Sequence, residues 1–305
     1  MKKLVAIRNA AAGAAGSAAA AAAIDVLSAE TDVVTVTLDG PDDLAGALAA
    51  HPDRRPVVLG GDGSLHALVA ALHERGELAD RPVGLIPMGT GNDFARTLGI
   101  PFDPEAAARV VLDGHQRTLD LLHDGRGGIA VNAVHLGIGA EASRRATPLK
   151  PWLRRFAYAL GSVVAGLRVR GWHLRVTVDD ETVADGRRRV LMVGIGSGMT
   201  IGGGTPLLPD AEPGDGLVDV VVSFATGPLS RLVYAKRLRD GSHTAHPDVV
   251  HRRGGRVVVA GDEVPVNADG ELSGPYSRHE WRLEPKAWHI TAPAPDRPAG
   301  ADDES

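Results

Sequence analysis

The chain has 305 residues, a formal net charge of −5 and no cysteine. This length predicts two domains, and the negative charge excludes nucleic acid as the default partner. The absence of cysteine excludes disulfides and thiolate metal sites and favours a reducing cytoplasm.

The first 22 residues combine two lysines, an apolar run and many alanines, which resembles the composition of a secretory signal. Arg8 and Asn9 interrupt that pattern, and the apolar run at residues 4–7 is too short for a signal core. We therefore expect a first β-strand followed by an alanine-rich helix. No stretch reaches the apolar length needed to span a bilayer, so we expect a cytoplasmic protein, with contact at the inner membrane surface left open.

Short β-branched runs alternate with helical patterns over residues 1–116. The expected strands cover residues 3–7, 33–38, 56–59 and 83–86, and a helix-like segment follows each of them. This alternation predicts a doubly wound α/β domain, in which helices cover a parallel sheet.

One of these helices follows the sequence GGDGS at residues 60–64. Leu65, Leu68, Val69 and Leu72 repeat at the spacing of one helix face, and Ser64 is the expected N-cap. The glycine-rich segment thus joins the carboxyl end of a strand to the start of a helix. Ligands bind at that edge in open α/β sheets.

A mostly β, sandwich-like second domain is predicted over residues 117–291, with the active site in the cleft between the domains. Its expected strands cover residues 117–122, 128–137, 172–178, 189–195, 218–224, 255–261 and 280–283. Two helices are expected, at residues 151–169 and 228–239. The segment 292–305 is rich in proline and acidic residues and is predicted to be a disordered tail.

The predicted helix at residues 151–169 begins with basic and aromatic side chains and continues with apolar ones. Such a helix could lie transiently on an anionic membrane surface. An ordinary core helix is the alternative, and the pattern alone favours it.

The glycines of GGDGS predict a phosphate-binding loop. Gly60, Gly61 and Gly63 would let a phosphate approach backbone N–H groups, and the following helix directs its positive end at that anion. Asp62 suits such a loop if it binds a magnesium ion that bridges phosphates, or if it accepts a proton from an incoming hydroxyl. An ordinary glycine turn is the alternative.

A second glycine loop makes the phosphate-binding interpretation more specific. The sequence PMGTGNDFAR at residues 87–96 follows the strand expected at residues 83–86, so two glycine loops face one edge of the sheet. The region lacks the lysine and the spacing of a Walker A motif, and it is not the GxGxxG of a dinucleotide fold.

Four segments of the sequence resemble one family. GGDGS at 60–64, PMGTGNDFAR at 87–96, PDAEPGDGLVDV at 209–220 and NADGE at 267–271 are similar, in this order, to the soluble diacylglycerol kinases. These lipid kinases share a superfamily with sphingosine kinases, NAD kinases and phosphofructokinases. The resemblance implies an ATP- and Mg²⁺-dependent kinase that transfers the γ-phosphoryl group to the hydroxyl of diacylglycerol or a similar lipid.

The resemblance also implies the residues that contact ATP. They are Gly60, Gly61, Asp62, Gly63, Ser64, Leu65, His66, Ala67, Thr90, Asn9, Gly13 and Thr37. Asn9 and Gly13 are what this chain retains of an NPxSG loop in the family. Ala67 stands where many relatives carry Glu in GGDGTLNE.

The same resemblance implies a metal site and a catalytic base. Asp215 would give its carboxylate to a structural Mg²⁺, Glu212 and Leu217 their backbone oxygens, and Asp93 would reach the ion through water. Glu271 is the preferred proton acceptor for the lipid hydroxyl, with Asp269 and Asp62 as rivals.

Two alternatives remain open at the level of sequence. The acceptor could be a sphingoid base, ceramide or another alcohol, or the chain could be a catalytically silent, nucleotide-binding relative. The retained Asp62, Asp93, Asp215 and Glu271 argue against the silent relative. The sequence does not decide whether residues 202–204, three glycines in a row, shape the cleft or merely turn the chain, and it leaves the oligomeric state open, a homodimer included.

Overall fold

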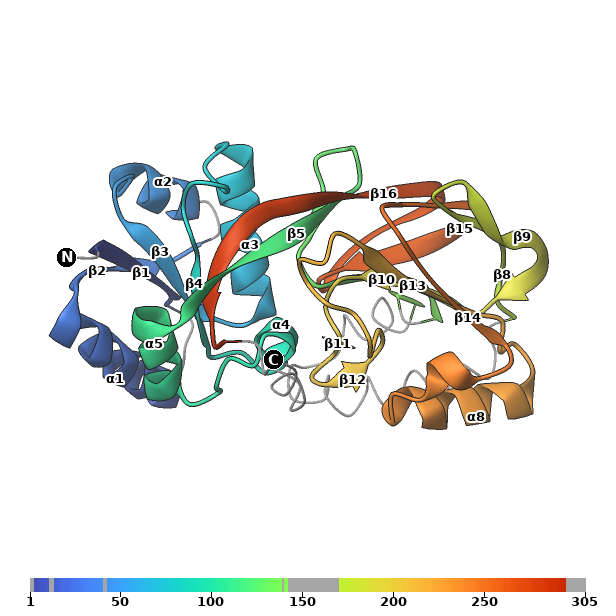
Figure 1. Ribbon diagram of the computed structural model, residues 1–305, viewed down its shortest axis with the longest axis horizontal. Helices are drawn as coiled ribbons and strands as arrows, with labels where there is room; N and C mark the ends of the chain where they lie inside the picture. The colour runs from blue at the N-terminus through green and yellow to red at the C-terminus, as the bar shows by residue number, and fades with distance from the viewer. Residues whose placement is uncertain (1–2, 11–13, 41–42, 139, 142–169, 295–305) are drawn as a thin grey trace, which may run out of the picture.

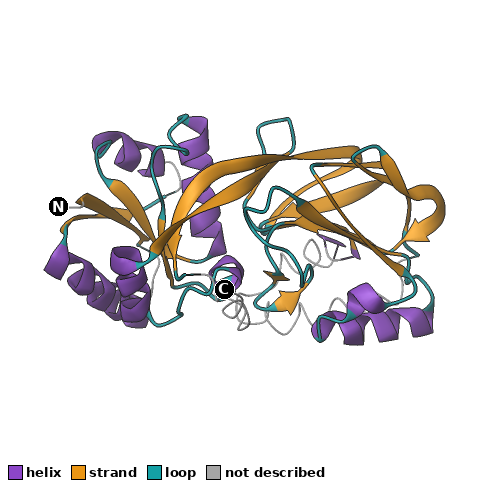
Figure 2. Cartoon of the chain, viewed as in Figure 1, coloured by secondary structure: helices purple, strands orange, loops and turns teal. Residues whose placement is uncertain are grey.

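The computed structural model describes residues 3–10, 14–40, 43–138, 140–141 and 170–294. Figure 1 shows two parts side by side, an N-terminal part that carries most of the helices and a C-terminal part built mainly of strands. The colouring in Figure 2 makes the same division visible by secondary structure. The predicted order, an α/β domain followed by a mostly β domain, is confirmed.

The first domain is built on a four-stranded parallel sheet with the strand order β2-β1-β3-β4. Its strands are β1 (Lys3–Asn9), β2 (Asp32–Leu38), β3 (Arg55–Gly60) and β4 (Gly84–Pro87). The central residues of β1 and β3 and all four residues of β4 are buried, because helices cover both faces of the sheet. All four strands expected in this part of the sequence are present.

The helices of this domain lie on both faces of the sheet. They are α1 (Ala14–Glu30), α2 (Asp43–Ala50), α3 (Asp62–Glu74), the short α4 (Asp93–Thr97) and α5 (Pro104–Asp113). In Figure 1, α2 and α3 lie on one side of the sheet, and α1 and α5 lie on the other. The expected strand and alanine-rich helix at the N-terminus are therefore observed as β1 and α1.

The start of α3 differs from the expectation. The apolar side chains predicted for its inner face, Leu65 to Leu72, are buried, but the N-cap is Gly61 and not Ser64. The N–H of Ser64 already donates to the Gly61 carbonyl at 3.0 Å, so Ser64 lies within the first helical turn. Gly61 is the one residue between β3 and α3, and the predicted phosphate loop is thus the first turn of the helix itself.

The second domain is organised around a large antiparallel sheet. Its strands are β5 (His115–His123), β6 (Ile129–Ala130), β7 (Ala133–Gly137), β8 (Trp172–Val178), β9 (Glu181–Val190), β10 (Met192–Gly196), β13 (Val218–Ser223), β14 (Val249–Gly254), β15 (Arg256–Ala268) and β16 (Glu271–Ala292). A small hairpin is formed by β11 (Thr200–Ile201) and β12 (Thr205–Pro206). The helix expected at 228–239 is α8 (Pro228–Arg239), and a 3₁₀ turn, η1 (His243–Ala245), follows it. The helix expected at 151–169 lies outside the described residues.

Strand β16 connects the two domains. It pairs with β5 and brings Trp288 and Ile290 into the core of the first domain, where both are fully buried. Ile290 forms a parallel bridge with Val83, next to β4, and the side chain of Arg55 donates to the Thr291 hydroxyl. The expected domain boundary at residues 116 and 117 falls inside β5, and most of the expected tail, residues 295–305, lies outside the described residues. Within the described chain, every helix is too short or too polar to cross a membrane.

Candidate active site

Several predicted nucleotide-binding residues meet at one edge of the parallel sheet. Asn9 ends β1, Gly60 ends β3, and Thr37 lies one residue before the end of β2. Parallel strands end at the same edge, so the topology brings these residues together. The Thr37 hydroxyl accepts a hydrogen bond from Arg8 Nε at 3.1 Å. Gly13 lies outside the described residues.

The two glycine loops touch each other through their backbones. A Cβ added to Gly61 would lie 2.9 Å from Gly89 Cα, and one added to Gly89 would lie 2.4 Å from Gly61 Cα. Only glycine fits at both positions without a backbone shift. Asn92, in the left-handed conformation, closes the second loop by donating to the Gly89 carbonyl and accepting from the Gly89 N–H.

The remaining residues of the glycine loops differ in where their side chains lie. Leu65 is buried in the core and could contact a nucleotide through its backbone alone. Thr90 lines a cavity of about 420 Å³ between the second glycine loop and the start of α1, together with Gly89, Gly91 and Arg96. The predicted contacts with nucleotide remain predictions, but the shared edge of the sheet supports them.

The carboxylates of Asp62 and Asp93 both lie close to Gly91. A Cβ built on Gly91 would be 2.9 Å from Asp62 Oδ2 and 3.2 Å from Asp93 Oδ2. Asp62 Oδ1 accepts a hydrogen bond from the Phe94 N–H at 3.0 Å. Burial is the main cause that raises the pKa of Asp62; backbone N–H groups oppose the rise, and the charges of nearby carboxylates add to it.

The carboxylate of Asp93 links the two domains directly. Its Oδ1 accepts hydrogen bonds from Thr200 Oγ1 at 2.9 Å and from the Gly204 N–H at 2.7 Å, and its Oδ2 accepts from the Gly203 N–H at 2.8 Å. Two residues of the glycine run 202–204 thus shape the junction between the domains. The predicted water-mediated contact of Asp93 with a metal stays a prediction.

Asp269, in the turn between β15 and β16, contacts both the β6–β7 segment and α3. Its side chain is 2% exposed and accepts hydrogen bonds from the backbone N–H groups of Val131, Asn132 and Ala133 at 2.6 to 3.0 Å. Its Oδ2 also pairs with His66 Nδ1 at 3.0 Å. Both oxygens are therefore engaged, which leaves this carboxylate little freedom to accept a substrate proton.

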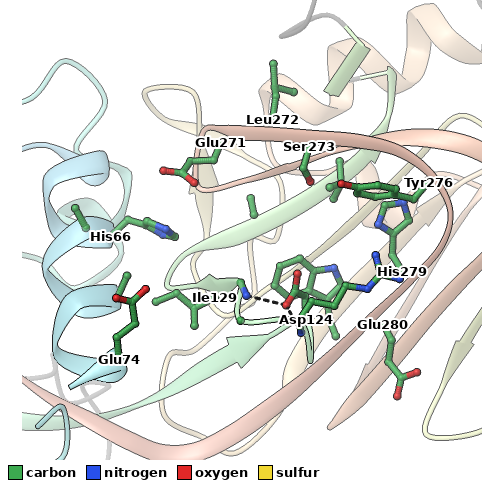
Figure 3. A pocket seen from close by; sticks show the side chains of 18 residues that line it. His66, Glu74, Asp124, Ile129, Glu271, Leu272, Ser273, Tyr276, His279 and Glu280 are labelled. Carbon is green, nitrogen blue, oxygen red and sulfur yellow. Dashed lines mark hydrogen bonds between the residues drawn. The ribbon is translucent and has the colours of Figure 1, made fainter. Parts of the chain in front are cut away.

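Glu271 lies at the start of β16, on the rim of a cavity of about 410 Å³ between α3 and the β15–β16 hairpin. Figure 3 shows Glu271 and His66 next to each other at the α3 side of this cavity, with Tyr276 and His279 at the other side. Unlike the carboxylate of Asp269, that of Glu271 is exposed and makes no hydrogen bond within the described residues. Of the three candidate bases, Glu271 is the best placed to meet a substrate.

The predicted metal ligands other than Asp93 lie in one loop that packs against β5. The Gly216 N–H donates to Asp120 Oδ2 at 2.8 Å, and a Cβ on Gly214 would lie 2.4 Å from the Thr118 carbonyl. Asp215 Oδ1 accepts from the Leu217 N–H, and its Oδ2 pairs with Arg253.

The oxygen atoms of this loop are suited to a magnesium ion. Mg²⁺ takes one or two carboxylates and keeps several waters. Asp215 offers a carboxylate, and no hydrogen bond in the described chain uses the carbonyl oxygens of Glu212 and Leu217. Arg253 competes for the same carboxylate. The described residues contain no group of three His, Asp or Glu side chains suited to a metal, so a site here would depend on backbone oxygens.

Comparison with known proteins identifies the family. Residues 3–123 match the diacylglycerol kinase catalytic domain, and residues 132–292 match the YegS C-terminal NAD kinase beta sandwich-like domain. A diacylglycerol kinase from Mycobacterium tuberculosis is 30% identical over 243 residues, which are 76% of this chain and 74% of that protein. The chain belongs to the diacylglycerol kinase family.

Other members of the diacylglycerol kinase family agree with this assignment. A diacylglycerol kinase from Staphylococcus saprophyticus is 29% identical over 228 residues, 72% of this chain and 70% of that protein. The crystal structure of a diacylglycerol kinase from Bacillus anthracis has a TM-score of 0.71 at 18% identity and covers 95% of this chain, which shows a common fold. As a diacylglycerol kinase family member, the protein is a lipid kinase with an alcohol group as acceptor.

The contacts that organise this lipid kinase site were not predictable from the sequence. His66 and Asp269 are 203 residues apart, and Asp93 and Thr200 are 107 apart. The sequence predicts His66 beside the nucleotide and Asp269 among the candidate bases, but it does not predict their contact with each other. No periodicity or motif spacing signals such pairs.

Proposed function

We propose that this lipid kinase uses ATP and Mg²⁺ to phosphorylate the hydroxyl of diacylglycerol or a similar lipid. The observation that carries the proposal is the arrangement along α3. Its first turn carries Asp62 and forms half of the paired glycine loops, and its next turn carries His66, which lines the cavity beside Glu271. A nucleotide at the loops and an acceptor in the cavity would then meet at one place.

In this proposal, the chain's own residues position the reactants. The N–H groups of the first turn of α3 bind phosphate oxygens at the positive end of the helix. Glu271 accepts the proton of the acceptor hydroxyl as its oxygen attacks. Asp215 and the carbonyl oxygens of Glu212 and Leu217 would hold a structural magnesium ion, which would support the loop when bound.

The first test is an acceptor panel. The protein is incubated with ATP labelled at the γ-phosphate, Mg²⁺ and micelles that contain diacylglycerol, a sphingoid base, ceramide or another lipid alcohol. We expect label in a lipid phosphate monoester, with diacylglycerol as the best acceptor. If only a sphingoid base or ceramide is labelled, that lipid replaces diacylglycerol as the proposed acceptor. If no acceptor is labelled, the result contradicts the proposal.

The phosphate-binding role of the first helical turn gives a second test. A Cβ added to Gly63 meets nothing within 4 Å, so we expect Gly63→Ala to fold normally and to gain about 0.5–1 kcal/mol of stability. The added methyl would occupy the space through which a phosphate reaches the backbone. ATP affinity, measured by calorimetry, should fall by about tenfold or more, which corresponds to ~1.4 kcal/mol.

Gly46→Ala is the matched control for Gly63→Ala. Gly46 lies in α2, and a Cβ there also meets nothing within 4 Å. This variant should gain similar stability without any change in ATP affinity. If both variants bind ATP equally well, the first turn of α3 is not part of the phosphate-binding site.

A further inference from the structure

His66 connects the two halves of the proposed reaction site. Asp62, His66 and Ala70 are spaced four residues apart on α3, so their side chains share one face of the helix. His66 and Ala70 line the cavity that Glu271 also lines, whereas Asp62 lies in the glycine loop. The imidazole of His66 therefore lies between the proposed phosphate site and the proposed acceptor site.

The orientation of this ring is fixed by Asp269. His66 Nδ1 lies 3.0 Å from Asp269 Oδ2, and Asp269 is itself held by three backbone N–H groups. No hydrogen bond within the described residues engages the other ring nitrogen, Nε2. Figure 3 shows the ring projecting from α3 into the cavity, next to Glu271. A side chain fixed at one nitrogen and open at the other is suited to contact a ligand.

The charges around His66 favour its protonated form. Asp269 faces it from the β15–β16 turn, Glu271 from β16, and Asp62 and Glu74 lie on its own helix. Burial of the ring lowers the pKa of His66, but the hydrogen bond to Asp269 and the charges of Asp269 and Glu271 outweigh burial and raise it. Arg126, from the loop between β5 and β6, is the opposing cation on the cavity wall.

The other basic side chains of the cavity wall are less available to bind a phosphate. The guanidinium of Arg126 lies over the ring of Tyr276, 5.5 Å from its centroid. His279 Nε2 lies 3.3 Å from the Val264 carbonyl oxygen, and burial lowers the pKa of His279. Among the described residues that line the cavity, His66 is therefore the basic side chain next to the glycine loop.

We propose that His66 is a catalytic residue, whose protonated ring donates a hydrogen bond from Nε2 to an oxygen of the transferred phosphoryl group. The inference rests on the proposed function. In the step, the acceptor oxygen forms a bond to the γ-phosphorus, the bond from that phosphorus to the oxygen of ADP breaks, and the hydroxyl proton passes to Glu271. His66 keeps its proton and stabilises the charge on the phosphoryl oxygens.

The first experiment needs no turnover. Affinities for ATP and ADP are measured with wild type, His66→Asn and His73→Asn at about pH 6 and about pH 9. Asparagine keeps an N–H donor for Asp269 but carries no charge. His73 lies on the same helix and does not line the cavity, so it is the matched control.

We expect wild type and His73→Asn to prefer ATP over ADP more strongly at the lower pH, where His66 is protonated. His66→Asn should lose about tenfold of that preference at the lower pH and show no change with pH. Equal pH dependence in wild type and His66→Asn would overturn the proposal.

The second experiment is the pH dependence of kcat. The pKa of His66 in the folded protein is raised above the ordinary histidine pKa of about 6.5. His66 is therefore protonated at pH values below about 6.5, and it loses its proton as the pH rises through its own, higher pKa. Wild-type kcat should therefore fall as His66 loses its proton, which gives the pH profile a basic limb. In His66→Asn, kcat should be roughly 100-fold lower and the basic limb absent.

The outcomes separate the inference from the proposed function. If wild type phosphorylates no acceptor, the proposed function fails, while the ATP and ADP affinities still decide the role of His66. If wild type is active and His66→Asn retains the basic limb, the inference fails and the function stands. Loss of an acid limb instead would make His66 the proton acceptor and also overturn the proposed role.

Discussion

Glu271→Gln is expected to reduce kcat for phosphoryl transfer by about 1,000-fold without unfolding the protein. Glutamine has nearly the same shape but cannot accept the proton of the acceptor hydroxyl. The side chain is exposed at the start of β16, so its replacement removes no buried contact. The measurement is the initial rate with saturating ATP and the best acceptor of the panel, with thermal unfolding as the test of the fold.

Glu263→Gln provides the control for this prediction. Glu263 is an exposed carboxylate on β15, the other strand of the same hairpin, and does not line the cavity. Its variant should retain wild-type activity. A Glu271→Gln enzyme that also retains full activity would remove Glu271 as the base, and Asp62 would then become the candidate to test.

Asp269→Asn is expected to lower the free energy of unfolding by about 2–3 kcal/mol. Asparagine accepts the left-handed backbone at this position, where φ is 49°, so the change isolates the side chain. One carboxylate oxygen becomes an NH₂ group, which would face a donor, either the Val131 N–H or those of Asn132 and Ala133. A buried donor without an acceptor produces the loss. Urea unfolding of wild type and variant measures it.

Asp262→Asn is the comparison for Asp269→Asn. Asp262 is an exposed aspartate of β15 whose Oδ2 accepts one hydrogen bond, from the His173 N–H. We expect its variant to lose less than about 1 kcal/mol. If Asp269→Asn were as stable as Asp262→Asn, the hydrogen bonds of Asp269 would not be what holds the turn between β15 and β16.

The parallel sheet and the α3 helix were predictable because local patterns determine them. β1, β3 and β4 are continuous apolar runs bounded by polar or glycine residues, and Leu65 to Leu72 repeat at helical spacing. The start of α3 was placed three residues too late, because serine is the stronger N-cap by preference. The short connection from β3 made glycine the cap instead.

The second domain was less predictable for two physical reasons. β9 carries several charged residues and is largely exposed, so no alternation of apolar side chains reveals it. The single run expected at 189–195 is divided between the end of β9 and β10. The length of β16 was also missed, because half of it is an exposed hairpin strand whose partner, β15, fixes it through backbone pairing.

The proximity of the two glycine loops was predictable from the sequence, but the contacts between the domains were not. The glycines and acidic residues were recognised from motifs, and Asp62, Gly61 and Gly89 indeed meet. The pairing of His66 with Asp269 depends on how two domains pack, which no local pattern contains. The three candidate bases differ in burial and hydrogen bonding, which the sequence alone does not reveal.

The return of β16 to the first domain has a consequence for biosynthesis. Trp288, Ile290 and two alanines of β16, Ala287 and Ala292, complete a core whose other members come from the first half of the chain. The chain must therefore be synthesised through β16 before that core can close. The first domain is made first, but it reaches its final form only after Trp288 and Ile290 have been added, so truncation before Trp288 would leave both domains incomplete.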